Sequence, residues 1–186
     1  MERGGRREAH QQLYDKQVDK LTSHLRSANL PTRQAKLYRA AALRVLKRMT
    51  EAGLARLENN LTAYYFYPDL AGVTAAGGNE NSLGFYRASN GSIHLDGGDA
   101  DNSIHDTYAH EYTHALDGPN DEISGTQEWQ DAWREEIVNG EGLGGEGADF
   151  PDEGLAYLGE LILRGKRELA RDECPKCLAV WEGLGL

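Results

Sequence analysis

Cysteine is scarce in this chain of 186 residues, and the only two, Cys174 and Cys177, form a single CxxC pair. A tetrahedral structural zinc site needs four ligands, so this pair cannot make one by itself. A thioredoxin-like role requires a βαβ context, which the surrounding sequence lacks. We therefore expect a packing or incidental pair of thiols.

Long apolar runs are also missing. No stretch approaches the ~18 consecutive apolar residues that a membrane-spanning helix needs. The first ten residues, MERGGRREAH, are basic but are not followed by the apolar segment of an export signal. We expect a soluble protein with no membrane partner, cytoplasmic rather than secreted unless an export signal has been removed. The length favours a single compact domain.

Positive charge is sparse beyond the first third of the chain. Residues 1–60 hold 13 Lys/Arg against 6 Asp/Glu, whereas residues 61–186 hold 7 against 24. An acidic body of this kind favours cations and cationic peptides, and nucleic-acid binding is not expected. Two solvated helix faces account for the asymmetry equally well.

Apolar positions recur at helical spacing in residues 8–28 and again in residues 32–57, with Pro31 between the two segments. The pattern predicts two amphipathic helices. We expect residues 1–60 to form a helical segment packed on a body made by residues 61–186.

Strand signals follow these helices. Residues 61–67 form an aromatic and β-branched run that ends at a proline, which is typical of a strand and a turn. Asn90-Gly91 lies between the segments 83–88 and 92–96, and this dipeptide is the strongest short signal for a β-hairpin.

The rest of the chain returns to helical patterns, in residues 104–116, 126–138, from 151 onward and 177–181. Residues 139–147 hold five glycines and predict a mobile loop. Together with the predicted strands, these segments indicate an α+β fold.

The pentapeptide His110-Glu111-Tyr112-Thr113-His114 spells HExxH inside one of these predicted helices. Residues four apart lie on one helical face, so both imidazoles can bind one tetrahedral ion. Glu111 is offset so that its carboxylate can reach a water on the ion. The motif indicates a zinc hydrolase with Glu111 as the general base and Zn²⁺ as the cofactor.

A catalytic zinc ion usually has three protein ligands, so a third is expected downstream. The metzincin pattern is excluded, because its glycine and third histidine fall at Asp117 and Asn120. Asp117 lies too close to His114 on a straight helix to complete a tetrahedron, and we expect it to cap or orient. The candidate that opens a second helix is Glu153.

Glu153 also has a purely structural interpretation, in which its negative charge stabilises the first turn of its helix. Glu160, seven residues later, lies on the same face. It either holds a metal-bound histidine through the second ring nitrogen or forms an ion pair with Arg164.

These residues carry a family resemblance. The sequence HEYTHALD at 110–117, followed by Glu153-Gly154-Leu155-Ala156 and Glu160, resembles gluzincin-type zinc metallopeptidases. That group includes the anthrax lethal factor catalytic domain, the Mlc titration factor A type and the Pro-Pro endopeptidases. The resemblance covers about residues 83–163.

The resemblance implies a zincin-like α+β domain with a small mixed sheet, an active-site helix carrying HExxH and a second ligand helix. His110, His114 and Glu153 are then the zinc ligands. It also implies that the strand at 92–96 is the edge along which an extended substrate pairs.

Two positions depart from the family pattern. Gly154-Leu155 replaces an aromatic pair, and residues 139–152 lack the tyrosine that relatives place shortly before the third ligand to steady the oxyanion. Tyr157 is the candidate substitute.

The function predicted from the sequence is a zinc-dependent peptidase, with endopeptidase action favoured over aminopeptidase action. Its partner is a peptide or protein substrate. The alternative is a non-catalytic or regulatory module that binds peptides or proteins on a metallopeptidase scaffold.

Overall fold

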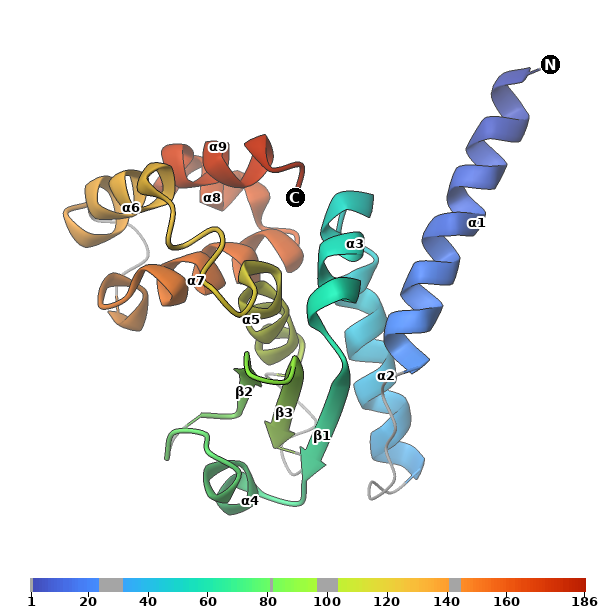
Figure 1. Ribbon diagram of the computed structural model, residues 1–186, viewed down its shortest axis with the longest axis horizontal. Coiled ribbons are helices and arrows are strands. Elements are labelled where there is room, and N and C mark those ends of the chain that lie inside the picture. The colour runs from blue at the N-terminus through green and yellow to red at the C-terminus, as the bar shows by residue number, and fades with distance from the viewer. Residues whose placement is uncertain (1, 24–31, 81, 97–103, 141–144) are drawn as a thin grey trace.

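The computed structural model describes residues 2–23, 32–80, 82–96, 104–140 and 145–186. Within these ranges, helices surround a small mixed sheet (Figure 1), which confirms the predicted α+β class. No helix among the described residues is both long enough and apolar enough to span a bilayer.

The sheet is formed by β1 (Ala63–Tyr67), β2 (Gly84–Arg87) and β3 (Ser92–Asp96). Its order is β1-β3-β2, with β1 parallel and β2 antiparallel to β3. The expectation that residues 92–96 form the edge is therefore wrong. Because β1 pairs with β3 on the side opposite to the hairpin, β3 is central and all five of its residues are buried. The sheet has two edge strands, β1 and β2, and β2 is the one that packs against the helix at residues 104–117.

The predicted hairpin forms, and its turn needs a glycine. Gly91 has a φ of 65°, in the left-handed region that suits glycine. A β-carbon there would lie 2.3 Å from the carbonyl oxygen of Asn60. Tyr86 of β2 donates its hydroxyl hydrogen to the same oxygen at 2.9 Å, so hairpin and preceding helix are joined at this point.

The N-terminal third forms α1 (Glu2–Ser23), α2 (Thr32–Leu46) and α3 (Glu51–Asn60). The prediction of one helix over 32–57 is wrong, because the chain turns at residues 47–50. Thr50 is the N-cap of α3, and its hydroxyl accepts a hydrogen bond from the Gly53 amide at 3.0 Å. α2 and α3 pack against α5 (Ile104–Asp117), and α1 lies along their outer side (Figure 1).

The remaining elements are α4 (Leu70–Ala75), α6 (Gln127–Trp133), a π-helical segment (Arg134–Val138), a 3₁₀ turn (Gly145–Ala148), α7 (Pro151–Leu163), α8 (Arg167–Glu173) and α9 (Pro175–Gly183). The sequence patterns did not predict α4, and they did not distinguish α8 from α7. Within the loop predicted to be mobile, residues 141–144 lie outside the described residues.

α5 and α7 lie side by side, and their closest approach is at a glycine. A β-carbon on Gly159 of α7 would lie 2.0 Å from the hydroxyl oxygen of Thr113 on α5. Thr113 is fully buried, and its hydroxyl donates to the Ala109 carbonyl in its own helix at 2.8 Å. The absent side chain thus sets the distance between the two helices that carry the candidate site.

Candidate metal centre

One face of α5 is buried in the core, and another face lines a cleft. Tyr108, Tyr112 and Leu116 are buried in the main hydrophobic cluster, and the Tyr112 hydroxyl lies 2.7 Å from that of Tyr64 on β1. His110 and His114 lie on another face and line the cleft. The helical period of 3.6 residues explains this separation.

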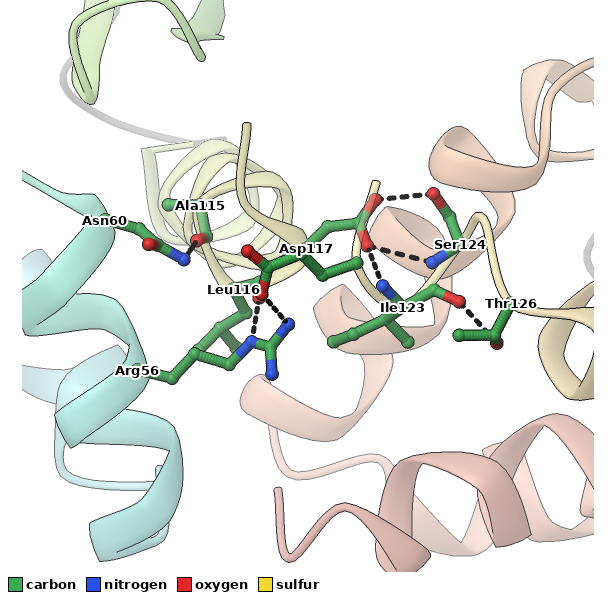
Figure 2. A network of polar contacts seen from close by, with 9 residues as sticks. Arg56, Asn60, Ala115, Leu116, Asp117, Ile123, Ser124 and Thr126 are labelled. Atoms are coloured by element: carbon green, nitrogen blue, oxygen red, sulfur yellow. Dashed lines mark hydrogen bonds and ion pairs between the residues drawn. The ribbon is translucent and has the colours of Figure 1, made fainter. Parts of the chain in front are cut away.

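The C-terminal end of α5 is held by α3, as Figure 2 shows. The amide of Asn60 donates to the Ala115 carbonyl at 2.8 Å, and Arg56 donates to the Leu116 carbonyl. The last carbonyls of a helix have no partner within the helix, so these side chains satisfy them. The N-terminal helices therefore anchor the end of α5 nearest to His114.

Asp117 orients the loop that follows α5 and does not hold a histidine in the structure. Its carboxylate accepts hydrogen bonds from the Ile123 amide at 2.7 Å, the Ser124 amide at 2.9 Å and the Ser124 hydroxyl at 2.5 Å (Figure 2). This agrees with the expected orienting role, but the oriented group is the loop. The loop includes Asp121, whose φ of 49° is uncommon for a residue with a side chain.

Glu153 enters the site at the start of α7, and two tryptophans of α6 hold the chain that leads to it. The indole nitrogen of Trp133 donates to the Gly147 carbonyl at 2.8 Å, and that of Trp129 donates to the Pro151 carbonyl at 2.9 Å. Gly154 has no room for a side chain, since a β-carbon would lie 2.5 Å from Trp133. Trp133 thus fills the space beside the glycine that stands where an aromatic residue was expected.

The side chains of His110, His114 and Glu153 converge. The two Nε2 atoms lie 3.2 Å apart, and the carboxylate oxygens of Glu153 lie 3.2 Å from His110 Nε2 and 3.7 Å from His114 Nε2. A tetrahedral ion with bonds of about 2.0–2.1 Å requires ligand atoms about 3.3 Å apart. The three residues therefore fit one metal ion, and they are the one such group found among the described residues.

Glu111 lies beside this group and is 4% exposed. One carboxylate oxygen, Oε2, has no hydrogen-bond partner in the part of the chain that the structure describes, while the carboxylate accepts a hydrogen bond from the Tyr86 backbone amide of the edge strand. Burial raises the pKa of Glu111, although the nearby imidazoles oppose this effect. A buried oxygen without a partner next to a metal-ligand set fits a carboxylate that exchanges protons with a water there.

Because these side chains lie so close together, they change each other's pKa values when no metal ion is bound. Burial disfavours the charged His114 ring, but its hydrogen bond to Glu153 and the charges of Glu111 and Glu153 outweigh burial and raise its pKa to about 9. Hydrogen bonds to both histidines hold the pKa of Glu153 well below its ordinary range. In the absence of a metal ion, both shifts favour a protonated His114 ring beside an ionised Glu153 carboxylate.

Of the two alternatives predicted for Glu160, the structure shows the ion pair. Glu160 forms an ion pair with Arg164 at 2.9 Å, and Arg164 also binds Asp106 of α5 at 2.7 Å. The described contacts therefore join α7 to α5 through Arg164, a role that the sequence did not indicate for Asp106. Tyr157 packs edge-on against His110, with ring centroids 5.4 Å apart, and so lies at the site.

Two clefts meet at the site. The first, which we call the C-terminal arm, has a volume of about 270 Å³ and lies at the C-terminal end of α5; its walls include residues 77–79, Tyr86, Asp117, Asp121 and Asp152. The second, the N-terminal arm, has a volume of about 260 Å³ and includes Leu83, Asp106, Thr107, Tyr157 and Glu160. Ser82, Gly84, His110 and Glu111 line both arms.

A buried histidine and the two cysteines lie apart from the site. His94 is buried in β3, where it hydrogen-bonds to Ser92 and Tyr67 and stacks on Phe85. Cys174 and Cys177 are both buried and unbridged, and burial raises the pKa of both thiols.

Comparison of the chain with protein-family models gave no match, and comparison with curated proteins also gave none.

Proposed function

We propose that this protein is a zinc-dependent endopeptidase of the gluzincin type, with a zincin-like catalytic domain. The observation that carries the proposal is the convergence of His110, His114 and Glu153 at tetrahedral spacing beside a buried carboxylate oxygen that has no partner. Two nitrogen ligands and one oxygen ligand suit Zn²⁺, which commonly retains a fourth position for water in catalytic sites.

When bound, the zinc ion polarises the substrate carbonyl and lowers the pKa of a water molecule. Glu111 accepts the proton from the attacking water at Oε2 and transfers it to the leaving amine. The Tyr86 amide holds the carboxylate of Glu111 in place. Burial raises the pKa of Glu111 and so favours this transfer of a proton at neutral pH.

Tyr157 is the candidate that steadies the developing oxyanion. Its ring lies against His110 and lines the same arm as Glu111. A hydroxyl donor placed at a developing negative charge lowers the barrier, because the bond strengthens in the transition state.

Endopeptidase action is supported by the two arms, since they leave the site on opposite sides along α5. A substrate can extend beyond the scissile bond in both directions. The edge strand β2 borders both arms, and so an extended peptide can pair along β2.

The first test compares Glu111→Gln with Glu153→Gln. We expect Glu111→Gln to bind zinc as the unaltered protein does and to lose peptide hydrolysis by at least about 10³-fold, because the general base is gone. Glu153→Gln is expected to weaken zinc binding strongly, because a charged ligand becomes neutral. Zinc affinity is measured by competition with a chelator, and hydrolysis by mass spectrometry of a peptide library.

Two results would overturn this assignment. Glu153→Gln with unaltered zinc affinity would exclude Glu153 as the third ligand. Retention of peptides without turnover by the zinc-loaded protein would favour the alternative, a binding module on a peptidase scaffold.

A further inference from the structure

The C-terminal arm carries unbalanced negative charge. Asp117, Asp121 and Asp152 line it, and the described residues of its lining include neither lysine nor arginine. Asp117 is satisfied by the three donors of residues 123–124. No ion pair among the described residues involves Asp121 or Asp152, whereas the adjacent Glu122 is paired with Arg56 at 2.8 Å.

Metal loading does not remove this charge. A divalent ion is balanced by the carboxylates of Glu111 and Glu153, so the centre becomes close to neutral. Asp121 and Asp152 remain uncompensated next to it. Burial raises the pKa of Asp121, and the negative charges of Asp117 and Asp152 raise it further, which shows that these carboxylates lie within each other's field.

The N-terminal arm differs in this respect. Apart from Glu111, which lines both arms, its acids are Asp106 and Glu160, and both bind Arg164, at 2.7 and 2.9 Å. The excess negative charge is therefore confined to one side of the site. Glu111 lines both arms, and among the described residues its buried Oε2 has no hydrogen-bond partner, so a polar group that is not accounted for by the chain opens onto the acidic arm.

We propose that the substrate is a peptide with lysine or arginine on the side of the scissile bond that lies in the C-terminal arm, and that Asp121 and Asp152 determine this specificity. The inference rests on the proposed peptidase function. A basic side chain gains the attraction of two carboxylates there, while an acidic one is repelled.

The experiment is cleavage-site profiling of the zinc-loaded, full-length protein with a random peptide library, using Glu111→Gln as the blank. We expect lysine and arginine to be enriched, and aspartate and glutamate depleted, on one side of the cleavage point only. For a matched pair of peptides that differ by Lys against Gln at the enriched position, kcat/KM is expected to differ by at least about tenfold.

The double variant Asp121→Asn/Asp152→Asn should lower this Lys/Gln ratio towards one. The matched control is Asp172→Asn/Glu173→Gln, which neutralises two exposed acids at the end of α8 that line neither arm. The control should keep the ratio. Raising the salt concentration should also lower the ratio in the unaltered protein, since salt screens exposed charges.

The outcomes separate the two proposals. Cleavage above the blank with no basic preference, or with a preference that the double variant retains, overturns this inference and leaves the peptidase function intact. An absence of cleavage above the blank overturns the peptidase function. In that case, fluorescence anisotropy compares binding of two labelled peptides of equal length, one with lysine and one with glutamine at every second position, and equal affinities overturn the inference.

Discussion

Tyr157 places a phenol ring against the first histidine of the site, with ring centroids 5.4 Å apart. Replacing it with phenylalanine keeps the ring and removes only the hydroxyl. If the hydroxyl stabilises the transition state, Tyr157→Phe should lower kcat by about 10²-fold or more, with little change in KM. Steady-state kinetics on a cleaved peptide measures this effect.

The control for Tyr157→Phe is zinc affinity, which should be unaltered because the phenol is not one of the three ligands. A variant with unchanged kcat would exclude Tyr157 from the chemistry. A loss of zinc affinity would instead show that the hydroxyl acts through the metal ligands and not on the oxyanion.

At the scale of single residues, residue type and spacing predicted which side chains come together. His110 and His114 are four residues apart on one helix, and Glu153 was the candidate that opens a later helix. Asp117 and Glu160 were not assignable in this way. The loop amides of residues 123–124 come near Asp117 only after folding, and for Glu160 the spacing allowed both Arg164 and a metal-bound histidine as the partner.

The link between α6 and α7 yields a prediction at the level of elements. Trp133→Phe keeps most of the ring but removes the indole donor that binds the Gly147 carbonyl. The segment leading to Glu153 is then held less firmly. Because groups that orient metal ligands commonly contribute 10–100-fold to affinity, we expect zinc affinity to fall by about tenfold.

Trp181→Phe is the matched control, because Trp181 is also buried and its indole nitrogen has no hydrogen-bond partner among the described residues. Chelator competition should show no change in zinc affinity for this variant. Equal losses in both variants would mean that general destabilisation is the cause.

Elements were predicted best where a local signal defines them. Asn90-Gly91 located the hairpin, and Thr126 started α6 as its N-cap, with its hydroxyl accepting from the Trp129 amide at 3.2 Å. Strand order was not predictable, because the parallel pairing of β1 with β3 joins residues far apart in the chain. That pairing alone decides that β2, and not β3, is the edge.

For the molecule as a whole, His94 predicts how stability depends on pH. It is 3% exposed, and burial, followed by the charge of Arg87, lowers its pKa to about 4. Between about pH 6.5 and 4 the unfolded chain binds a proton that the folded chain does not bind. Stability therefore falls as the pH falls through this window, by at most about 3 kcal/mol from this residue.

The measurement is urea unfolding at pH 7 and pH 4.5 with a chelator present, for the unaltered protein and for His94→Phe. The variant should lose less stability on acidification, whatever its stability at pH 7. An identical pH dependence in the two proteins would contradict the assignment.

At this scale the sequence predicted the fold class and the charge asymmetry, but not where the basic helices lie. Their apolar faces, with Val45, Leu54 and Leu57 buried, pack behind α5. The residues that line the two arms all come from positions beyond 76.

The contact at Gly159 has a consequence for the choice of ion. Since a β-carbon at that position would lie 2.0 Å from the Thr113 hydroxyl oxygen, a larger residue there would push α7 away from α5. Glu153 would then move away from His110 and His114, whose present spacing suits bonds of about 2 Å. Ions such as Ca²⁺, with bonds of about 2.3–2.6 Å and a need for six or more oxygens, fit a group of three ligands at this spacing poorly. We therefore expect any preference for a small ion to depend on Gly159, a residue outside the candidate ligand set.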